Sequence, residues 1–127
     1  MSVMTVNFPS RYLHSNQTIS VILPDRPLDA DPRPFYATTR RLRVLWLLHG
    51  TFGDHTDWIR RTNIETYATE AGVAVIMPSA LNSNYSDWPG FSLGFDANRF
   101  LIDELLPLAH SWLPVSAARE DNVIAGL

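Results

Sequence analysis

The sequence contains no cysteine. Without thiols it can form no disulfide framework and no cysteine-ligated zinc site, and it can carry no cysteine nucleophile. This absence fits a reducing compartment, where disulfides are rare. We therefore predict a cytoplasmic location.

Basic charge and long apolar runs are also scarce. Ten Lys and Arg residues stand against 13 Asp and Glu residues, for a net charge of −3. A nucleic-acid-binding protein normally shows a basic face, and two isolated arginine pairs, at 40–41 and 60–61, do not make one. No run approaches the 18 apolar residues of a membrane span, and the first residues lack the pattern of a signal peptide. We expect neither nucleic acid nor membrane as a partner.

What the chain does have is apolar content sufficient for a core. Of its 127 residues, 46% are hydrophobic and 18% are charged, so we predict one domain over residues 1–127. Residues 3–8 and 18–23 are rich in β-branched side chains and predict an antiparallel hairpin. Four prolines between positions 24 and 34 predict a surface connection over residues 24–41.

The central pattern is a strand, a turn, a helix and a second strand. Residues 43–48 are apolar at consecutive positions, as in a parallel strand covered on both faces. Thr62 and Glu65 match a capping box, and Gly72 is placed to end the helix that follows it. Residues 73–77 form the next apolar strand. This βαβ unit predicts an α/β fold with a mostly parallel sheet flanked by helices.

The second half continues the alternation. A long loop over residues 79–95 contains several aromatic side chains, and a helix is expected from about residue 96. An apolar stripe at helical spacing predicts its buried face, formed by Leu101, Leu105, Leu108 and Trp112. Pro107 should kink or split this helix, and Pro114 should end it. Residues 122–125 begin a last apolar strand.

The turn after the central strand, His49-Gly50-Thr51-Phe52-Gly53, is the best candidate for chemistry. A glycine turn at the end of a buried strand exposes backbone amides, and acyl-transfer enzymes need such amides to hold an oxyanion. A plain strand-to-helix turn is the alternative. A metal site is not expected, because Gly50 and Phe52 stand where the HxHxDH pattern of metallohydrolases requires histidines. No cofactor is expected either.

Residues 123–127 read VIAGL, which supplies a strand and the first two residues of a G-x-S-x-G nucleophile elbow. Together with LLHGTFGDHTDWIRRTNIETYA and with ELLP at 104–107, this segment resembles the esterase family of α/β-hydrolases. That family includes tributyrin esterases and S-formylglutathione hydrolases. The resemblance covers roughly residues 42–127 and corresponds to the N-terminal half only, ending just before the nucleophile serine.

The resemblance implies roles for part of the site. The Thr51 backbone amide, with Phe52 as the next candidate, would serve the oxyanion hole, and Gly50 and Gly53 would shape the turn. The Ser-Asp-His triad would lie beyond Leu127. None of the four histidines is therefore assigned as the general base, and His49 is expected to pack under the turn; the four are His14, His49, His55 and His110.

Trp88 and Phe91 fall where the family borders its acyl pocket. They could equally cap the core, and the sequence leaves both interpretations open. The expected partner is a small-molecule ester.

The function implied is that of a serine carboxylesterase acting on short-chain acyl esters of the tributyrin or S-formylglutathione type. One alternative is an inactive half-domain, or one fragment of a split hydrolase that needs a complementary C-terminal half. A second is an acyltransferase or thioesterase on the same fold. The last strand would be an exposed apolar edge, which favours association with another chain. A homo-oligomer is one possible product of such association.

Overall fold

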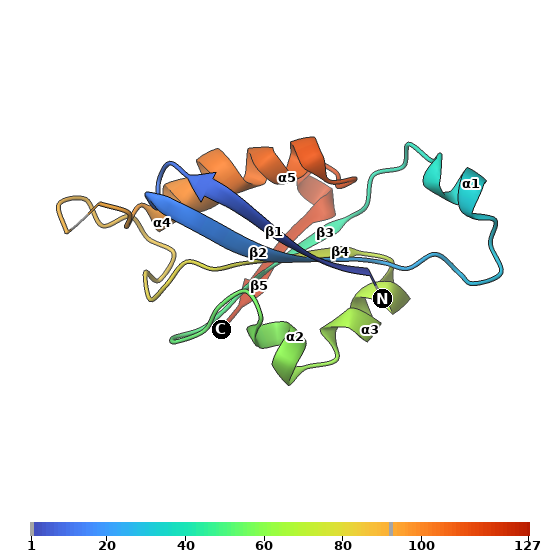
Figure 1. Cartoon of the computed structure of the whole chain (residues 1–127), viewed down its shortest axis with the longest axis horizontal. Helices are drawn as coiled ribbons and strands as arrows, with labels where there is room; N and C mark the ends of the chain where they lie inside the picture. The colour runs from blue at the N-terminus through green and yellow to red at the C-terminus, as the bar shows by residue number, and fades with distance from the viewer. Residues whose placement is uncertain (1, 92) are drawn as a thin grey trace.

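The computed structural model describes residues 2–91 and 93–127, which form a twisted sheet with helices on both faces (Figure 1). The strands are β1 (Ser2–Ser10), β2 (Ser15–Leu23), β3 (Val44–Leu48), β4 (Ala74–Pro78) and β5 (Asn122–Gly126). The α-helices are α1 (Pro32–Tyr36), α2 (Asp57–Arg61), α3 (Ile64–Ala71), α4 (Ala97–Arg99) and α5 (Leu106–Trp112). A π-helical segment, η1 (Phe100–Leu105), joins α4 to α5, and a 3-10 turn, η2 (Arg119–Asp121), precedes β5.

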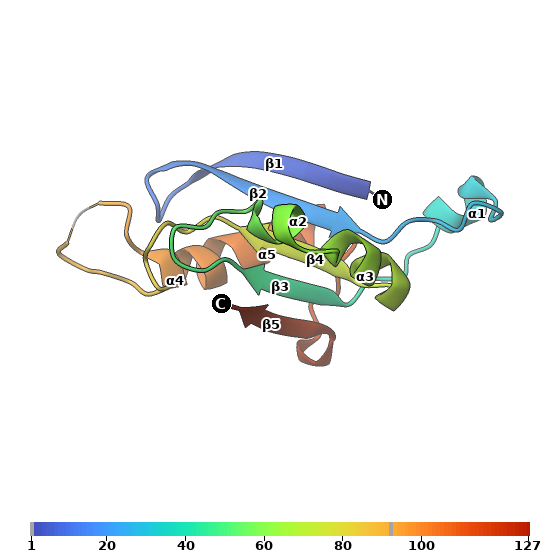
Figure 2. The same ribbon diagram turned by 90° about the horizontal axis from the view of Figure 1, so that it is seen from below.

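The sheet has the order β1-β2-β4-β3-β5, which can be followed across Figure 2. The predicted hairpin is confirmed: β1 and β2 pair antiparallel from Ser2 opposite Leu23 to Ser10 opposite Ser15. β2 also runs antiparallel to β4, whereas β3 runs parallel to both β4 and β5. The α/β class is therefore confirmed. The sheet is mixed and not mostly parallel, because the parallel pairing is confined to β3, β4 and β5.

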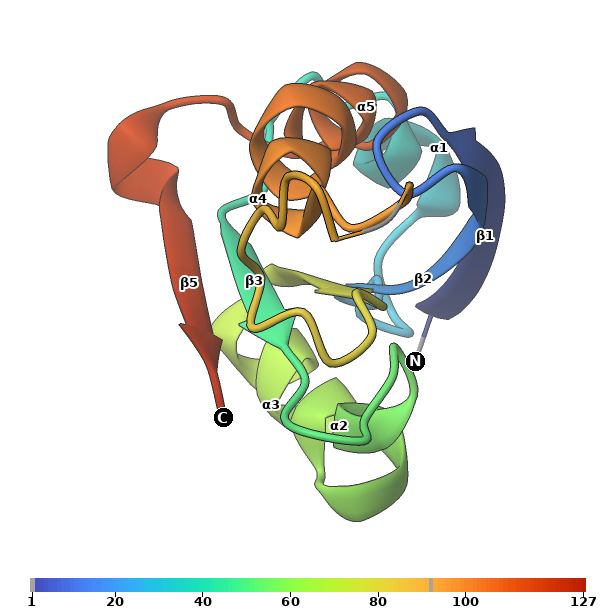
Figure 3. The same cartoon turned by 90° about the vertical axis from the view of Figure 1, so that its left-hand side faces the viewer.

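Each face of the sheet has its own apolar cluster. On one face Phe100 and Leu105 are fully buried, and Phe100 stacks on Phe8 with ring centroids 6.1 Å apart. On the other face Leu47, Val75 and Met77 pack beneath α2 and α3. Figure 3 shows these two helical layers above and below the strands. Every residue of β4 is buried, as expected for a strand covered on both faces.

The helix after the glycine turn differs from the prediction at its start. A separate short helix, α2, precedes it, and Thr62 closes that helix by donating from its hydroxyl to the Trp58 carbonyl at 2.6 Å. The same hydroxyl accepts a hydrogen bond from the Ile64 amide at 3.2 Å, so the capping box with Glu65 does not form. The predicted end is confirmed: Gly72 adopts a φ of 63° and caps α3.

The proline-rich connection is a loop, as predicted, but it contains α1. Asp31 caps this helix by accepting a hydrogen bond from the Arg33 amide at 3.0 Å, and Pro32 occupies its first turn. Proline suits that position because the first amides of a helix have no backbone acceptor within the helix, so a missing amide costs little there. Helix α1 projects from one end of the molecule, away from the sheet (Figure 1).

The long helical segment is interrupted where Pro107 predicts it. Before the proline the chain widens into the π-helical turn η1, in which the Leu106 amide donates to the Leu101 carbonyl. The predicted buried stripe is correct for Leu101 and Leu105 but wrong for Trp112, which is 62% exposed. Ala109 and Leu113 are buried instead, because a π turn takes more residues than an α turn and shifts the helical phase.

Strand β5 lies at the edge of the sheet, as predicted, and pairs with β3; its Val123 and Ile124 side chains are exposed. Within residues 2–91 and 93–127, no helix combines the length and the apolar character that a membrane crossing requires.

Candidate active site

The glycine turn follows directly from the carboxyl end of β3. The Gly53 amide donates to the Gly50 carbonyl at 3.1 Å, which closes a four-residue turn with Phe52 at a φ of 60°. A side chain at position 53 would force its neighbours to shift, since its Cβ would lie 3.0 Å from the Gly50 carbonyl oxygen and closer still to the Asp57 carboxylate. The sequence Gly-Thr-Phe-Gly therefore forms a tight turn at the end of the strand.

His49 lies beneath this turn and is 3% exposed. Its Nδ1 lies 2.7 Å from the Gly50 carbonyl oxygen, and its Nε2 accepts a hydrogen bond from the Ala80 amide at 3.1 Å. The carbonyl requires a proton on Nδ1 and the amide requires a lone pair on Nε2, so the ring is the neutral Nδ1–H tautomer. With both nitrogens engaged, His49 supports the turn and has no nitrogen left for proton transfer.

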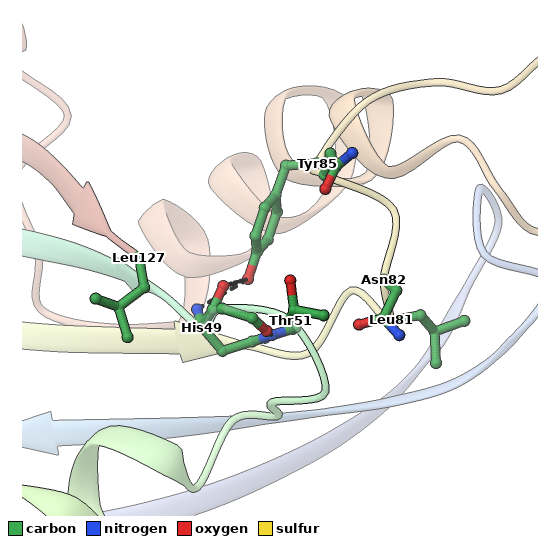
Figure 4. Close-up of a pocket in the computed structure, with 8 residues that line it drawn as sticks. His49, Thr51, Leu81, Asn82, Tyr85 and Leu127 are labelled. Carbon is green, nitrogen blue, oxygen red and sulfur yellow. Dashed lines mark hydrogen bonds between the residues drawn. The ribbon is translucent and has the colours of Figure 1, made fainter.

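Tyr85 contacts the same residue from the opposite loop. Its hydroxyl accepts a hydrogen bond from the His49 amide at 3.0 Å, and Figure 4 shows the phenol ring reaching down to the turn. Burial raises the pKa of Tyr85 to about 12. The phenol is therefore neutral in the ordinary working range of an enzyme, and it acts as a fixed hydrogen-bonding group.

The two candidate amides are in different states. The Phe52 amide donates to Oδ1 of Asn82 at 2.8 Å. Among the described residues, none accepts a hydrogen bond from the Thr51 amide. Thr51 thus offers the unoccupied donor of the turn, and Phe52 offers a donor only if Asn82 gives way.

A hollow of about 210 Å³ opens beside Thr51. Its walls come from the turn, from the loop after β4 and from the end of β5, and its lining residues are His49, Gly50, Thr51, Leu81, Asn82, Asn84, Tyr85 and Leu127. A Cβ at Gly50 would lie 3.2 Å from the Leu127 Cβ, so the end of β5 meets the turn at van der Waals distance. Parallel strands β3 and β5 therefore deliver their carboxyl ends to one hollow, where open α/β sheets bind ligands.

Backbone strain is concentrated around this hollow. Five described residues other than glycine have positive φ, and four of them lie at the hollow or on the adjacent turn: Phe52, Leu81, Asn84 and Tyr85. Each such conformation costs roughly 1–3 kcal/mol and persists only where the surrounding structure imposes it. Strain of this kind clusters at functional sites.

A second hollow, of about 320 Å³, is lined by Asn82, Trp88, Phe91 and Phe95. The Trp88 indole is fixed by a hydrogen bond from Nε1 to the Ser83 carbonyl at 2.8 Å, and Phe91 packs edge-on against Phe95 at 5.1 Å. Phe91 is 71% exposed, so it covers little of the core. Asn82 borders both hollows, which makes the aromatic hollow a direct neighbour of the turn.

The remaining histidines lie outside this site. Nδ1 of His55 is 2.7 Å from the Ser20 hydroxyl on β2, and His110 packs edge-on against Trp46 at 6.3 Å. His14 belongs to the β1–β2 hairpin turn. In the part of the chain that the structure describes, no cluster of three or more His, Asp or Glu side chains could hold a metal ion.

Comparison with known proteins places this arrangement among esterases. The chain is 33% identical over its whole length to an acetyl esterase of Caldicellulosiruptor saccharolyticus, and it spans 47% of that protein. Its structure matches a fluorophosphonate-binding serine hydrolase of Staphylococcus aureus with a TM-score of 0.82 at 33% identity. An S-formylglutathione hydrolase from the same organism matches with a TM-score of 0.79 at 31% identity. The chain is therefore similar in sequence and in structure to esterases of the α/β-hydrolase family.

These matches cover 98% of this chain and 46% of each of the two staphylococcal enzymes, so the chain spans about half the length of the esterases that it resembles. A ferulic acid esterase matches with a TM-score of 0.72 at 24% identity, which supports the fold alone. No protein-family model matches the chain.

Two residues of the site carry no assigned role in the sequence prediction. Asn82 and Tyr85 lie in a loop whose sequence is rich in aromatic and polar residues but contains no recognisable motif. Their one sequence signal is position, because the loop follows a parallel strand and so lies at the ligand-binding edge of the sheet. Their contacts with the turn depend on positive φ at Leu81, Asn84 and Tyr85, which the sequence does not indicate.

Proposed function

We propose that the polypeptide carrying this chain is a serine carboxylesterase acting on short-chain acyl esters. This chain would contribute the first oxyanion donor, the Thr51 amide, with Phe52 as the second candidate and with Gly50 and Gly53 shaping the turn. The nucleophile and its Asp and His partners would follow β5. A serine placed after Leu127 would lie beside Gly50, within reach of a carbonyl bound at Thr51.

The observation that carries this proposal is the unoccupied Thr51 amide beside the carboxyl ends of the paired strands β3 and β5. Attack on an ester carbonyl develops negative charge on oxygen, and a preorganised backbone donor stabilises it without reorganisation. Relatives named as an acetyl esterase and an S-formylglutathione hydrolase support short acyl groups as substrates. We extend the proposal to Trp88 and Phe91 as the walls of the acyl or alcohol pocket.

Replacing Thr51 with proline tests this role directly, because proline removes the amide hydrogen and leaves the turn possible. Thr51 holds the second position of the turn and is not among the residues with positive φ, and proline is favoured at that position. We expect kcat for p-nitrophenyl acetate to fall about 100- to 1,000-fold, the usual effect of losing one oxyanion donor. The measurement uses the full-length polypeptide.

Thr51→Ala is the matched control, since it shortens the same side chain and keeps the amide. We expect its kcat to stay within about threefold of the wild-type value. Equal melting temperatures for the two variants would exclude misfolding as the cause. Undiminished activity in Thr51→Pro would rule out the Thr51 amide as a donor, and an inactive wild-type protein would rule out the esterase.

Two further possibilities follow from the exposed edge and from the fold. An inactive half-domain, or a fragment that requires a complementary C-terminal half, is favoured by the apolar side chains on β5. An acyltransferase or thioesterase would use the same oxyanion turn with another acceptor. Acceptor profiling with water, alcohols and thiols separates these chemistries. The cytoplasmic location and a homo-oligomeric state stay predictions.

A further inference from the structure

The loop after β4 is bound to the glycine turn on both sides of Thr51. Ala80 donates from its amide to Nε2 of His49 at 3.1 Å, and Tyr85 accepts from the His49 amide at 3.0 Å. Beyond Thr51, Asn82 accepts from the Phe52 amide at 2.8 Å. Ala80, Asn82 and Tyr85 of the loop thus hold the residues before and after Thr51, and the Thr51 amide is the donor left between them. In Figure 4, Thr51 lies between His49 and Asn82.

The loop adopts an unfavourable conformation to make these contacts. Leu81 has a φ of 51°, Asn84 of 53° and Tyr85 of 52°. Leucine and tyrosine rarely occupy this region, because their Cβ crowds the backbone there. Leu81 directly precedes Asn82, and Tyr85 is itself one of the strained residues. The strained backbone therefore directs the Asn82 side-chain amide and the Tyr85 phenol toward the turn.

We propose that Asn82 and Tyr85 are positioning residues for ester hydrolysis, which hold the turn so that the Thr51 amide faces the substrate carbonyl. This inference rests on the proposed function. Asn82 sets the orientation of the Phe52–Gly53 end of the turn, and Tyr85 sets that of the His49 end. Asn82 also occupies the Phe52 amide, which leaves the Thr51 amide as the donor of the turn.

This arrangement predicts a kinetic effect confined to the transition state. A misdirected amide weakens the contact to the oxyanion and leaves ground-state binding intact, so kcat falls while KM is retained. Displacements of about 1 Å in a catalytic group can cost up to about 100-fold. We expect a loss of about 10-fold in kcat for Asn82→Ala and for Tyr85→Phe, with KM within about twofold.

Amide hydrogen exchange in residues 49–53 measures the same contacts without any need for activity. In the full-length protein, Asn82→Ala should speed exchange at Phe52, and Tyr85→Phe should speed it at His49, because each loses its acceptor. Asn82→Asp should retain the protection of Phe52, since a carboxylate oxygen replaces Oδ1. It should still lower kcat, because it places a negative charge beside the developing oxyanion.

Asn7→Ala is the matched control. Asn7 accepts a hydrogen bond from the Thr18 hydroxyl at 2.6 Å on the outer hairpin, remote from the turn. We expect this variant to change neither kcat nor exchange in residues 49–53. It removes a side-chain amide and one hydrogen bond, as Asn82→Ala does, so a general loss of stability would affect both variants alike.

The outcomes separate the two proposals. An active wild-type protein whose Asn82→Ala and Tyr85→Phe variants keep full kcat would overturn the positioning role and leave the esterase standing. Unchanged exchange in both variants would overturn it as well. A wild-type protein that hydrolyses no ester would contradict the esterase proposal. Faster exchange in its variants would then show the contacts alone, and the positioning role in ester hydrolysis would be overturned as well.

Discussion

At the scale of single residues, Glu104 shows how one side chain joins distant parts of the chain. Its carboxylate accepts a hydrogen bond from the Ser10 hydroxyl at 2.5 Å and another from the Arg11 amide at 2.8 Å. Both partners belong to the end of the β1–β2 hairpin, whereas Glu104 lies in η1. Glu104, the first residue of the ELLP motif, therefore connects the helical layer to the hairpin through these two hydrogen bonds.

We predict that Glu104→Ala lowers the free energy of unfolding by about 1.5–3 kcal/mol, the usual contribution of hydrogen bonds to a charged group. The variant leaves the buried Ser10 hydroxyl and the Arg11 amide without this acceptor. Urea denaturation of the full-length protein measures the change. Glu70→Ala, on the exposed surface of α3, should change stability by less than about 0.5 kcal/mol. Similar effects in the two variants would contradict a special role for Glu104.

The same scale shows where sequence reasoning about the site stops. The tight turn between Gly50 and Gly53 could be predicted, because glycines after a buried strand indicate such a turn, while the role of the Thr51 amide stays a prediction. Asn82 could not, because its contact with Phe52 depends on the strained backbone at Leu81. Residue letters indicate average preferences, and a strained conformation is by definition one that the local sequence disfavours.

At the scale of elements, the clearest departure from prediction is the helical segment that contains Pro107. Periodicity locates the helix and predicts Leu101 and Leu105 as buried, but it assumes 3.6 residues per turn throughout. The π turn before Pro107 takes up extra residues, so the next buried positions are Ala109 and Leu113. A local change in hydrogen bonding thus alters which face of the remaining helix meets the sheet.

We predict that Ala109→Leu destabilises the protein by about 1–3 kcal/mol, the usual cost of overpacking a filled core. Ala109 is fully buried, and a larger side chain there would push α5 away from the sheet. Trp112→Ala should cost much less, because that indole is largely exposed. Thermal unfolding of the two variants gives the comparison. The reverse order of stabilities would indicate an uninterrupted α-helix with Trp112 in the core.

At the scale of the whole molecule, the β5 edge leaves apolar side chains exposed. Ile124 is 65% exposed and lies beside an apolar groove of about 210 Å³, lined by residues of β3, η1, α5 and β5. An exposed apolar edge strand presents unpaired backbone groups and is prone to pair with another chain. The α/β class and its helical layers could be predicted from alternating apolar segments. The antiparallel pairing of β2 with β4 and the extent of this exposed edge are visible only in the structure.

We predict that residues 1–127, prepared alone, associate through β5. Light scattering over a range of concentrations should show particles larger than the 14.3 kDa monomer. Ile124→Lys should reduce the association, since a lysine on an edge strand opposes edge-to-edge pairing. A monodisperse monomer across that range would contradict the prediction.

The pairing of β5 with β3 also has a consequence for the order of folding. Val44 pairs with Asn122, so this parallel contact closes a long loop, whereas the β1–β2 hairpin forms from neighbouring residues. Contacts of large sequence separation form late, because the entropy of loop closure is lost before they gain stability. The hollow beside Thr51 is completed by Leu127 at the end of β5. We therefore expect the substrate site to be assembled among the last features of this chain as it leaves the ribosome, after its supporting turn and loop are in place.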